Sequence, residues 1–325
     1  MKHLSVNWSG WLAGRAGEPA PIEFDVLVIG SGYGAAVAAL RLAERGRKVT
    51  LLERGSEYRP GDFPNDLGVA PKHFRAPSPD GRAITGRATG LYELRAGPGV
   101  ISMLGNGLGG GSLINAGVVL QPDDDVFAQA AWPAELRSDA GGLAAHFKTA
   151  RAMLRAHSAL PMAGLRKARA FDALGAGLVP PRSGQAVDFT IDPARCIRCG
   201  DCASGCNVAG AKLTLRDTYL RHACDAGAML FNSATVYSIA RLAEGGWRVR
   251  VLPTESIARF RSVREAAHLG ADAGVGVDVQ AALVVIAAGT FGSTELLQRS
   301  KALEGARRRA PVAFAGARLA LVGQR

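Results

Sequence analysis

The chain has 325 residues, of which 41 are glycine and 48% are hydrophobic, and its formal net charge is +11. This apolar content is enough to build a core, which excludes a disordered chain, and the glycines have no three-residue period, which excludes collagen. The length fits one large domain or two modest ones, and it therefore allows an enzyme with a sizeable pocket.

The positive charge is unevenly distributed. The last 25 residues contain six basic residues and one acidic residue, whereas residues 1–300 contain no dense basic block. We interpret the charge as a solvated, Arg-rich surface rather than a nucleic-acid-binding site. There is no run of about 18–20 apolar residues, and residues 1–21 lack the apolar core of a signal peptide, so we expect no membrane span and a cytoplasmic location.

A nucleotide-binding unit is predicted near the start of the chain. Residues 24–29 (FDVLVI) are typical of a buried parallel strand, and residues 30–35 (GSGYGA) match G-x-G-x-x-G/A. A helix is predicted over residues 36–44, and a second strand over residues 48–52 ends next to Glu53. These parts stand in the order and at the spacing of a Rossmann unit.

Each small residue of this unit has a physical role. Gly30 permits a tight turn, Gly32 lets the backbone approach a pyrophosphate, and Ala35 lets the helix pack closely on the strand. The helix N-terminus offers unpaired N–H groups to phosphate oxygens. Glu53 is placed to accept hydrogen bonds from an adenosine ribose. By itself the unit does not distinguish FAD from NAD.

A second glycine-rich segment follows at residues 105–117 (GNGLGGGSLINAG). Such a backbone can lie against a flat or charged ligand without interference from side chains. Apolar residues on both sides of the segment indicate that it is packed rather than a free surface loop. Between the two glycine-rich segments, residues 60–100 contain many Pro, Gly and Asp residues and no long periodic stretch, which predicts loops over the cofactor.

Two further regions have clear local patterns. Residues 139–178 are rich in Ala and Leu and predict two helices broken near Pro161. Residues 247–253 alternate after the Gly245-Gly246 turn and predict a strand.

Four of the five cysteines form the compact run Cys196, Cys199, Cys202 and Cys206. This C-x₂-C-x₂-C-x₃-C spacing is that of bacterial ferredoxins, except that Asn207 stands where proline is expected. The run therefore offers a ligand set for an iron–sulfur cluster, with Cys224 as an alternative fourth ligand. Zinc is disfavoured, because its structural sites usually draw on two spaced pairs. Reduced or disulfide-linked structural thiols are the alternative.

Together these motifs resemble those of the glucose–methanol–choline (GMC) oxidoreductases, in their cholesterol-oxidase-like bacterial branch. The resemblance rests on GSGYGAA, on ERG after the second strand, on GLGGGSLINAGVVLQPDDDVF, and on LVVIAAGT at residues 283–290 with the helix start that follows. It covers residues 24 to about 300 and implies an α/β fold with a Rossmann-like parallel sheet that binds FAD. Proteins of this branch also have a stretch similar to the one that begins with the Cys run and ends with Gly210-Ala211-Lys212.

The resemblance implies specific cofactor contacts. The ADP half of FAD is expected at Tyr33, Gly34 and Glu53, together with Gly30, Gly32 and Ala35. The flavin and its linker are expected along Gly111, Asn115 and Ala116 of the second glycine-rich segment and along Val118 directly after it. Val236 is expected at the adenine, and Gly289 at the third glycine turn. For Val118 and Val236 a place in the core of a strand is the alternative.

The family implies oxidation of an alcohol, with a sterol-like one as a candidate, by hydride transfer to flavin; the electron acceptor is unassigned. Its catalytic His and partner lie near the C-terminus, and none of the six histidines here lies beyond residue 290, so catalytic residues remain unassigned. We expect an N-terminal extension (1–23), an FAD-binding region (24–300) with a Cys-rich insert (190–215), and an atypical basic tail (301–325).

The tail has no helix caps and no strand alternation, so the sequence predicts a truncated chain with an incomplete substrate-binding region. Two functional hypotheses follow. The first is an FAD-dependent alcohol oxidoreductase that is incomplete as this chain alone. The second is a flavin and iron–sulfur electron-transfer subunit that a partner chain completes.

Overall fold

The structure is a computed structural model that describes residues 2–15, 21–66, 68–77, 84–97, 99–158, 166–176, 187–259 and 276–307. None of the helices in these ranges combines the length and the apolar character that a membrane crossing requires.

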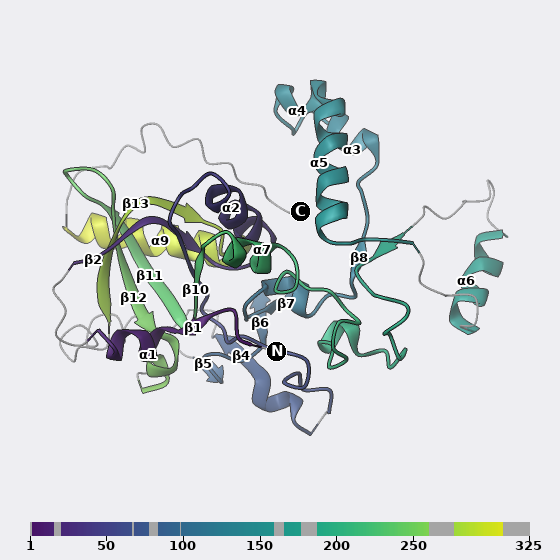
Figure 1. Ribbon diagram of the computed structural model, residues 1–325, viewed down its shortest axis with the longest axis horizontal. Coiled ribbons are helices and arrows are strands. Elements are labelled where there is room, and N and C mark those ends of the chain that lie inside the picture. The colour runs from purple at the N-terminus through teal and green to yellow at the C-terminus, as the bar shows by residue number, and fades with distance from the viewer. Residues whose placement is uncertain are drawn as a thin grey trace.

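A seven-stranded sheet forms the centre of the molecule (Figure 1). Its strands, in spatial order, are β1 (Val6–Asn7), β10 (Met229–Asn232), β3 (Val49–Leu52), β2 (Ile22–Ile29), β13 (Val277–Ile286), β12 (Trp247–Pro253) and β11 (Ala234–Arg241). The strands from β1 to β13 pair in parallel, and β12 and β11 continue the sheet as an antiparallel pair. The predicted strands at 24–29, 48–52 and 247–253 are confirmed. The LVVIAAGT motif of residues 283–290 contains the end of β13 and the start of the helix α9 (Gly289–Arg307).

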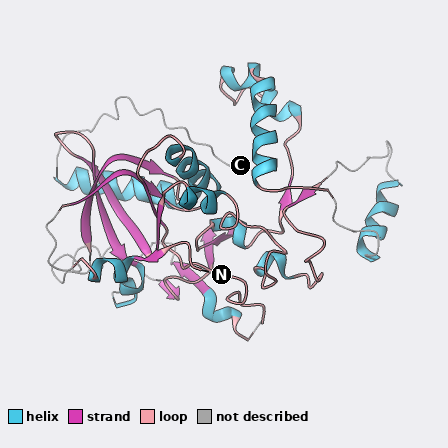
Figure 2. Cartoon of the chain, viewed as in Figure 1, coloured by secondary structure: helices cyan, strands magenta, loops and turns pink. Residues whose placement is uncertain are grey.

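Helices cover both faces of this sheet (Figure 2). On one face, α2 (Tyr33–Ala43) and α7 (Tyr219–Asp225) pack their small and aliphatic residues against β2 and β3. On the other face, Leu296 of α9 (Gly289–Arg307) and Trp8 of α1 (Trp8–Ala13) join a core with the strands β11 to β13. The carboxyl-terminal half of β2 and all of β3 are therefore buried on both faces, as is typical of parallel strands in α/β proteins, whereas Ala282 and Leu283 of the neighbouring β13 are exposed.

Residues 2–15, within the segment expected to be an N-terminal extension, are part of this architecture. β1 pairs with β10 at the edge of the main sheet, and Trp8 is fully buried beside Phe231. Asn7 caps α1 by accepting a hydrogen bond from the Gly10 N–H. A strand of two residues has no readable period, so this pairing could not be predicted from the sequence pattern.

The segment predicted as loops over the cofactor instead forms most of a second sheet. Its four strands lie in the order β5 (Ile84–Gly86), β4 (Phe74–Pro77), β6 (Tyr92–Gly97) and β7 (Val100–Gly105). The strands have three to six residues, and two of their inward positions are Arg75 and Glu93, both buried. Short strands with charged residues inside lack the apolar alternation that would have predicted them.

The helices α3 (Asp124–Ala128), α4 (Ala134–Ser138), α5 (Ala140–Met153) and α6 (Arg166–Ala176) lie apart from the main sheet in Figure 1. α5 and α6 confirm the two helices expected over residues 139–178, whereas the break at Pro161 lies outside the described residues. The strand β8 (Val118–Val119) pairs with β9 (Asp188–Phe189) and links this region to the rest of the chain.

Candidate cofactor-binding site

The three glycine-rich turns that the sequence singled out meet at the N-terminus of α2. Gly30 has a φ of +99°, and a Cβ atom there would lie 2.5 Å from the Ala287 carbonyl oxygen, so the ends of β2 and β13 are in direct contact. A Cβ atom on Gly110 would lie 3.0 Å from the Cα atom of Gly32. The first, second and third motifs therefore border one site, although up to 259 residues separate Gly30 from Gly289.

The side of this site that faces away from the fold is open. Gly32 is the N-cap of α2, and no side chain caps the helix. A Cβ atom added at any of four glycines, Gly32, Gly34, Gly111 or Gly289, would meet no atom within 4 Å. An uncapped helix N-terminus beside a face without side chains is the arrangement that a pyrophosphate group requires, because the group accepts hydrogen bonds from the helix N–H groups at close range.

Glu53 lies at the carboxyl end of β3 and is buried. Its carboxylate accepts a short hydrogen bond from the Ser31 hydroxyl and one of 2.8 Å from the Gly55 N–H. Burial raises the pKa of Glu53 above its usual range, even though these hydrogen bonds and the nearby Arg54 charge act in the opposite direction. The Ser31 hydroxyl and the Gly55 N–H bind different carboxylate oxygens, so each oxygen retains a lone pair that can accept a hydrogen bond from a ligand.

Ser31 joins the first two glycine-rich segments. Its hydroxyl oxygen accepts a 3.0 Å hydrogen bond from the Gly109 N–H, and the Gly107 carbonyl oxygen lies 3.2 Å away. Ser112 continues the connection, because its hydroxyl accepts from the Leu215 N–H and donates to the Gly109 carbonyl. The second segment is packed, as predicted, with Leu108 and Leu113 fully buried on either side.

A second contact between these segments joins Tyr33 to Asn115. The Asn115 side-chain amide donates a 2.8 Å hydrogen bond to the Tyr33 hydroxyl, and its oxygen accepts from the Gly117 N–H. Burial raises the pKa of Tyr33, which keeps the phenol neutral. Ala116 and Val118 are exposed, and Val118 belongs to the short strand β8.

The remaining predicted residues lie in the core. Ala35 is fully buried, as close packing of α2 on the sheet requires. The side chain of Val236 is also buried, which agrees with the alternative of strand core. The start of β11 nevertheless adjoins Glu53, because the Ala234 N–H donates a 2.9 Å hydrogen bond to the Glu53 carbonyl oxygen.

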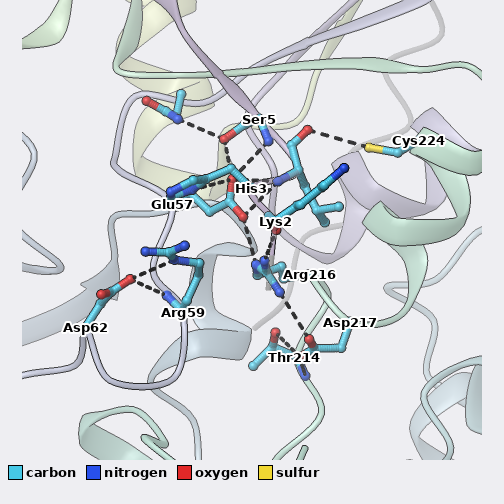
Figure 3. A network of polar contacts seen from close by, with 12 residues as sticks. Lys2, His3, Ser5, Glu57, Arg59, Asp62, Thr214, Arg216, Asp217 and Cys224 are labelled. Atoms are coloured by element: carbon cyan, nitrogen blue, oxygen red, sulfur yellow. Dashed lines mark hydrogen bonds and ion pairs between the residues drawn. The ribbon is translucent and has the colours of Figure 1, made fainter. Parts of the chain in front are cut away.

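Beneath the site, Glu57 forms the centre of a buried polar network, shown in Figure 3. It pairs with Arg216 at 2.8 Å and accepts hydrogen bonds from the Leu4 N–H and from both the N–H and the hydroxyl of Ser5. Burial would raise the pKa of Glu57, but these donors outweigh it and the pKa is lowered. Arg216 also donates to the Lys2 carbonyl, so the network holds the N-terminus against the second glycine-rich segment through Leu215.

A second charged cluster joins the small sheet to the main one. Glu93 contacts three guanidinium groups, those of Arg54, Arg75 and Arg95, and their charges hold its pKa low despite burial. Arg54 also donates a 2.8 Å hydrogen bond to Asn106, at the start of the second glycine-rich segment. Arg95 extends the cluster to Glu295 of α9. Arg54 directly follows Glu53, so this cluster fixes the chain next to the predicted ribose contact.

The Cys run lies in a well-anchored loop around a short 3₁₀ helix, η3 (Asp201–Ser204). Asn207, which stands where ferredoxins have proline, accepts hydrogen bonds from the Gly61 and Phe63 N–H groups and donates to the Phe63 carbonyl. Gly205 packs directly on the Phe63 ring. These hydrogen bonds explain why asparagine stands at position 207, which the comparison with ferredoxins did not.

The five cysteines are free thiols. Burial raises the pKa of the Cys202 thiol, while the nearby Lys212 charge opposes this. In the part of the chain that the structure describes, no group of three or more His, Cys, Asp or Glu side chains is arranged to hold a metal ion. Cys196, Cys199, Cys202 and Cys206 thus keep both interpretations, as ligands of an iron–sulfur cluster or as structural thiols, and the cluster stays a prediction.

Comparison with known proteins decides the family. The sequence model of the GMC oxidoreductases matches residues 24–319. The chain belongs to the GMC oxidoreductase family. This confirms the resemblance drawn from the motifs, together with the α/β, Rossmann-like fold.

Several curated proteins are similar to the chain. It is 31% identical to a cholesterol oxidase of Mycobacterium tuberculosis over 300 residues, which cover 85% of this chain and 47% of the relative. It is 26% identical to a long-chain-alcohol oxidase of Arabidopsis thaliana over 282 residues, which cover 86% of this chain and 34% of the relative. The chain thus spans about half the length, or less, of these relatives. The crystal structure of a pyridoxine 4-oxidase from Mesorbium loti shares 17% identity at a TM-score of 0.46, over 86% of this chain and 52% of that one.

FAD is the cofactor of this family, and the residues present fit its ADP half. The open glycine face and the uncapped N-terminus of α2 suit the pyrophosphate, and the buried Glu53 carboxylate suits ribose hydroxyl groups. The predicted residues from all three motifs border the same site.

Sequence reasoning missed the residues that connect these motifs. Ser31 is a variable position of G-x-G-x-x-G, and its contacts with Glu53 and Gly109 arise only in the folded chain. Arg54 was visible only as part of ERG. A serine inside the fingerprint and an arginine directly after the acidic residue are local signals that could have pointed to both.

The described histidines lie in structural or surface positions. His3 is 3.5 Å from Glu57, His73 is 3.4 Å from the Tyr58 hydroxyl, and His157 pairs its backbone with Phe189. His146 and His222 lie on α5 and α7, and His268 is outside the described residues. We assign no catalytic role to any of them.

Proposed function

We propose that the chain is the FAD-binding part of an oxidoreductase that oxidises a CH–OH group. The observation that carries the proposal is the convergence of three glycine-rich turns on an uncapped helix N-terminus beside a buried carboxylate. FAD, when bound, supplies the acceptor for the hydride that the alcohol carbon loses.

The residues of this chain bind and orient the cofactor. The N–H groups at the start of α2 hold the pyrophosphate, and Gly32 and Gly34 leave room for its close approach. Glu53 accepts from the ribose hydroxyl groups, and Ser31 and Gly55 keep its carboxylate in place. The backbone near Val236 lies beside the adenine, while Gly111, Asn115, Ala116, Val118 and Gly289 border the linker and the flavin.

The relatives support a bulky apolar alcohol as the substrate class. One is a cholesterol oxidase and another a long-chain-alcohol oxidase, so we propose a sterol-like or long-chain alcohol for the whole protein. We also propose the division at residues 24 and 300, with the Cys-rich insert between 190 and 215. The general base and the electron acceptor are not assigned to residues of this chain.

The binding half of the proposal is tested by titrating the purified chain with FAD and following the quenching of flavin fluorescence. We expect saturable binding at one FAD per chain in the wild type. Gly141→Val serves as a control and should bind FAD equally well, because Gly141 lies on α5 and an added Cβ atom there also meets no atom within 4 Å. Absence of binding in the wild type would overturn the proposal.

The reaction half is tested with the FAD-loaded chain under anaerobic conditions. Cholesterol and a long-chain primary alcohol are added separately, and the visible absorbance of the flavin is followed. Its loss with either alcohol supports oxidation of that substrate class by this chain. Its persistence with both would contradict oxidation by the chain on its own, while retained FAD would still support the cofactor-binding role.

A further inference from the structure

Lys212 is a buried cation beside the second glycine-rich segment. Only 4% of the residue is exposed, and burial lowers the pKa of its ammonium to about 8. Burial of a charge is costly unless hydrogen bonds satisfy it. The ammonium has three donors, and it uses them on three backbone carbonyl oxygens, those of Leu113, Asn115 and Cys202, the first at 3.0 Å and the last at 2.8 Å.

These three acceptors come from two separate segments. Leu113 and Asn115 lie at the end of the second glycine-rich segment, whereas Cys202 lies in the loop of the Cys run. Lys212 itself is held by its neighbours, because Ile191 bridges to it and the Leu213 N–H donates to the Thr190 carbonyl. A single side chain therefore fixes the backbone of residues 113–115 against an anchored part of the fold.

The orientation of one peptide group follows from this contact. In a trans peptide the carbonyl and the following N–H point in opposite directions. Because the Asn115 carbonyl points at the Lys212 ammonium, the Ala116 N–H points away from Lys212. Ala116 is exposed, and the N–H groups on either side of it are used within the segment, that of Asn115 by the Gly111 carbonyl and that of Gly117 by the Asn115 side-chain oxygen. The Ala116 N–H thus belongs to an exposed residue and points away from Lys212.

We propose that Lys212 is a positioning residue for the flavin half of FAD, holding the Asn115–Ala116 peptide so that the Ala116 N–H donates to the flavin ring. The inference rests on the proposed function, since it needs FAD at this site. It assigns Lys212 to the flavin and not to the ADP half, because two of its bonds end on residues 113 and 115, the third ends on Cys202, and none reaches the start of α2.

Comparing the affinities for FAD and for ADP distinguishes positioning of the flavin by Lys212 from a general contribution of Lys212 to stability. We compare calorimetric titrations of the full chain as wild type, Lys212→Met and Lys148→Met, the last being an exposed lysine on α5 that serves as the matched control. Lys212→Met is expected to bind FAD at least about tenfold more weakly and ADP within about twofold of wild type. Equal losses for both ligands, or wild-type affinity for both, would overturn the inference.

A second measurement needs no variant and so remains decisive if Lys212→Met fails to fold. Amide hydrogen exchange of the wild-type chain is followed without ligand, with ADP and with FAD. We expect FAD to slow exchange at Ala116 and ADP to leave it unchanged. An Ala116 amide that FAD binding does not protect would refute the inference, whereas a chain that binds neither ligand would refute the proposed function instead.

Discussion

Two buried carboxylates, four residues apart, show how differently the same stretch of chain is used. Glu53 and Glu57 are 8% and 7% exposed, so burial does not distinguish them. Glu53 accepts hydrogen bonds from a hydroxyl and a peptide N–H, and its pKa is raised. Glu57 accepts from two peptide N–H groups, a hydroxyl and the Arg216 guanidinium, and its pKa is lowered.

The difference lies in how far each charge is compensated. Around Glu57 the donors outweigh the cost of burial, so this carboxylate stabilises the fold when it is ionised. Around Glu53 they do not, so the ionised carboxylate is under-compensated until a ligand donates to it. A residue that we propose binds ligand and a residue that stabilises the fold thus lie four positions apart. Variants of Glu53 should mainly change nucleotide affinity, and variants of Glu57 should mainly change stability.

The largest expected effect is the loss of nucleotide binding in Gly32→Val. Gly32 has a negative φ of −67°, and an added Cβ atom meets no protein atom within 4 Å, so the variant should fold normally. Its side chain would occupy the space that the pyrophosphate needs. Calorimetry should detect no ADP binding, and the midpoint of urea unfolding should match that of wild type. Retained affinity would show that the phosphates do not lie at the start of α2.

Glu57→Gln should reduce stability by about 3–5 kcal/mol, because it leaves the buried Arg216 guanidinium without its carboxylate. The decrease is measured from urea unfolding curves at neutral pH. The ADP affinity of the folded fraction should stay close to wild type. A midpoint equal to that of wild type would mean that the network in Figure 3 contributes little to folding.

Glu53→Gln should show the opposite pattern. Loss of the charged acceptor should weaken ADP binding by about 1.5–3 kcal/mol, as measured by calorimetry. The apo chain should be no less stable than wild type, because the amide can donate to the Ser31 hydroxyl, which can turn its proton toward Gly107. Unchanged ADP affinity would contradict a contact between Glu53 and the ribose.

The smallest expected difference between Glu53 and Glu57 lies in how each contributes to the pH dependence of stability. The lowered pKa of Glu57 means that its contribution to stability is present above its unfolded pKa near 4.5 and is lost as the pH falls through the lower folded value. The raised pKa of Glu53 acts the other way, so its contribution is present below 4.5 and is lost as the pH rises through the higher folded value. Each group contributes at most about 1.4 kcal/mol per pH unit.

Urea midpoints from about pH 3 to about pH 7 check this. Stability of Glu57→Gln should fall less steeply than wild type on the acid side, and that of Glu53→Gln should lack the loss above pH 4.5. Parallel curves for all three proteins would contradict the opposite directions of the two pKa shifts.

The local parts of the site could be predicted from the sequence. Gly30, Gly32 and Glu53 have roles set by a single strand–turn–helix–strand unit, which spacing alone reveals. The strands β2, β3 and β12 and the helix α2 were predicted for the same reason, since each carries its own period, whereas β1 and β10 were not. The second glycine-rich segment was also visible in the sequence, the family resemblance added the turn at Gly289, and the structure brings Gly111 and Gly289 to the same site.

The rest depended on contacts between distant segments. Ser31 reaches Gly109, Arg54 reaches Glu93, and Lys212 reaches Leu113, and no local pattern encodes these pairs. The small sheet around Arg75 and Glu93 was predicted as loops because its inward residues are charged. For the Cys run, spacing alone does not distinguish the ligands of a cluster from structural thiols, so the iron–sulfur cluster stays a prediction.

We propose that the start of α2 and Glu53 form a site for the ADP half of FAD. The decisive test is titration of the wild-type chain with ADP alone, by calorimetry at neutral pH. We expect saturable binding at one ADP per chain that FAD displaces competitively. A chain that binds FAD but not ADP, or neither of them, would contradict it.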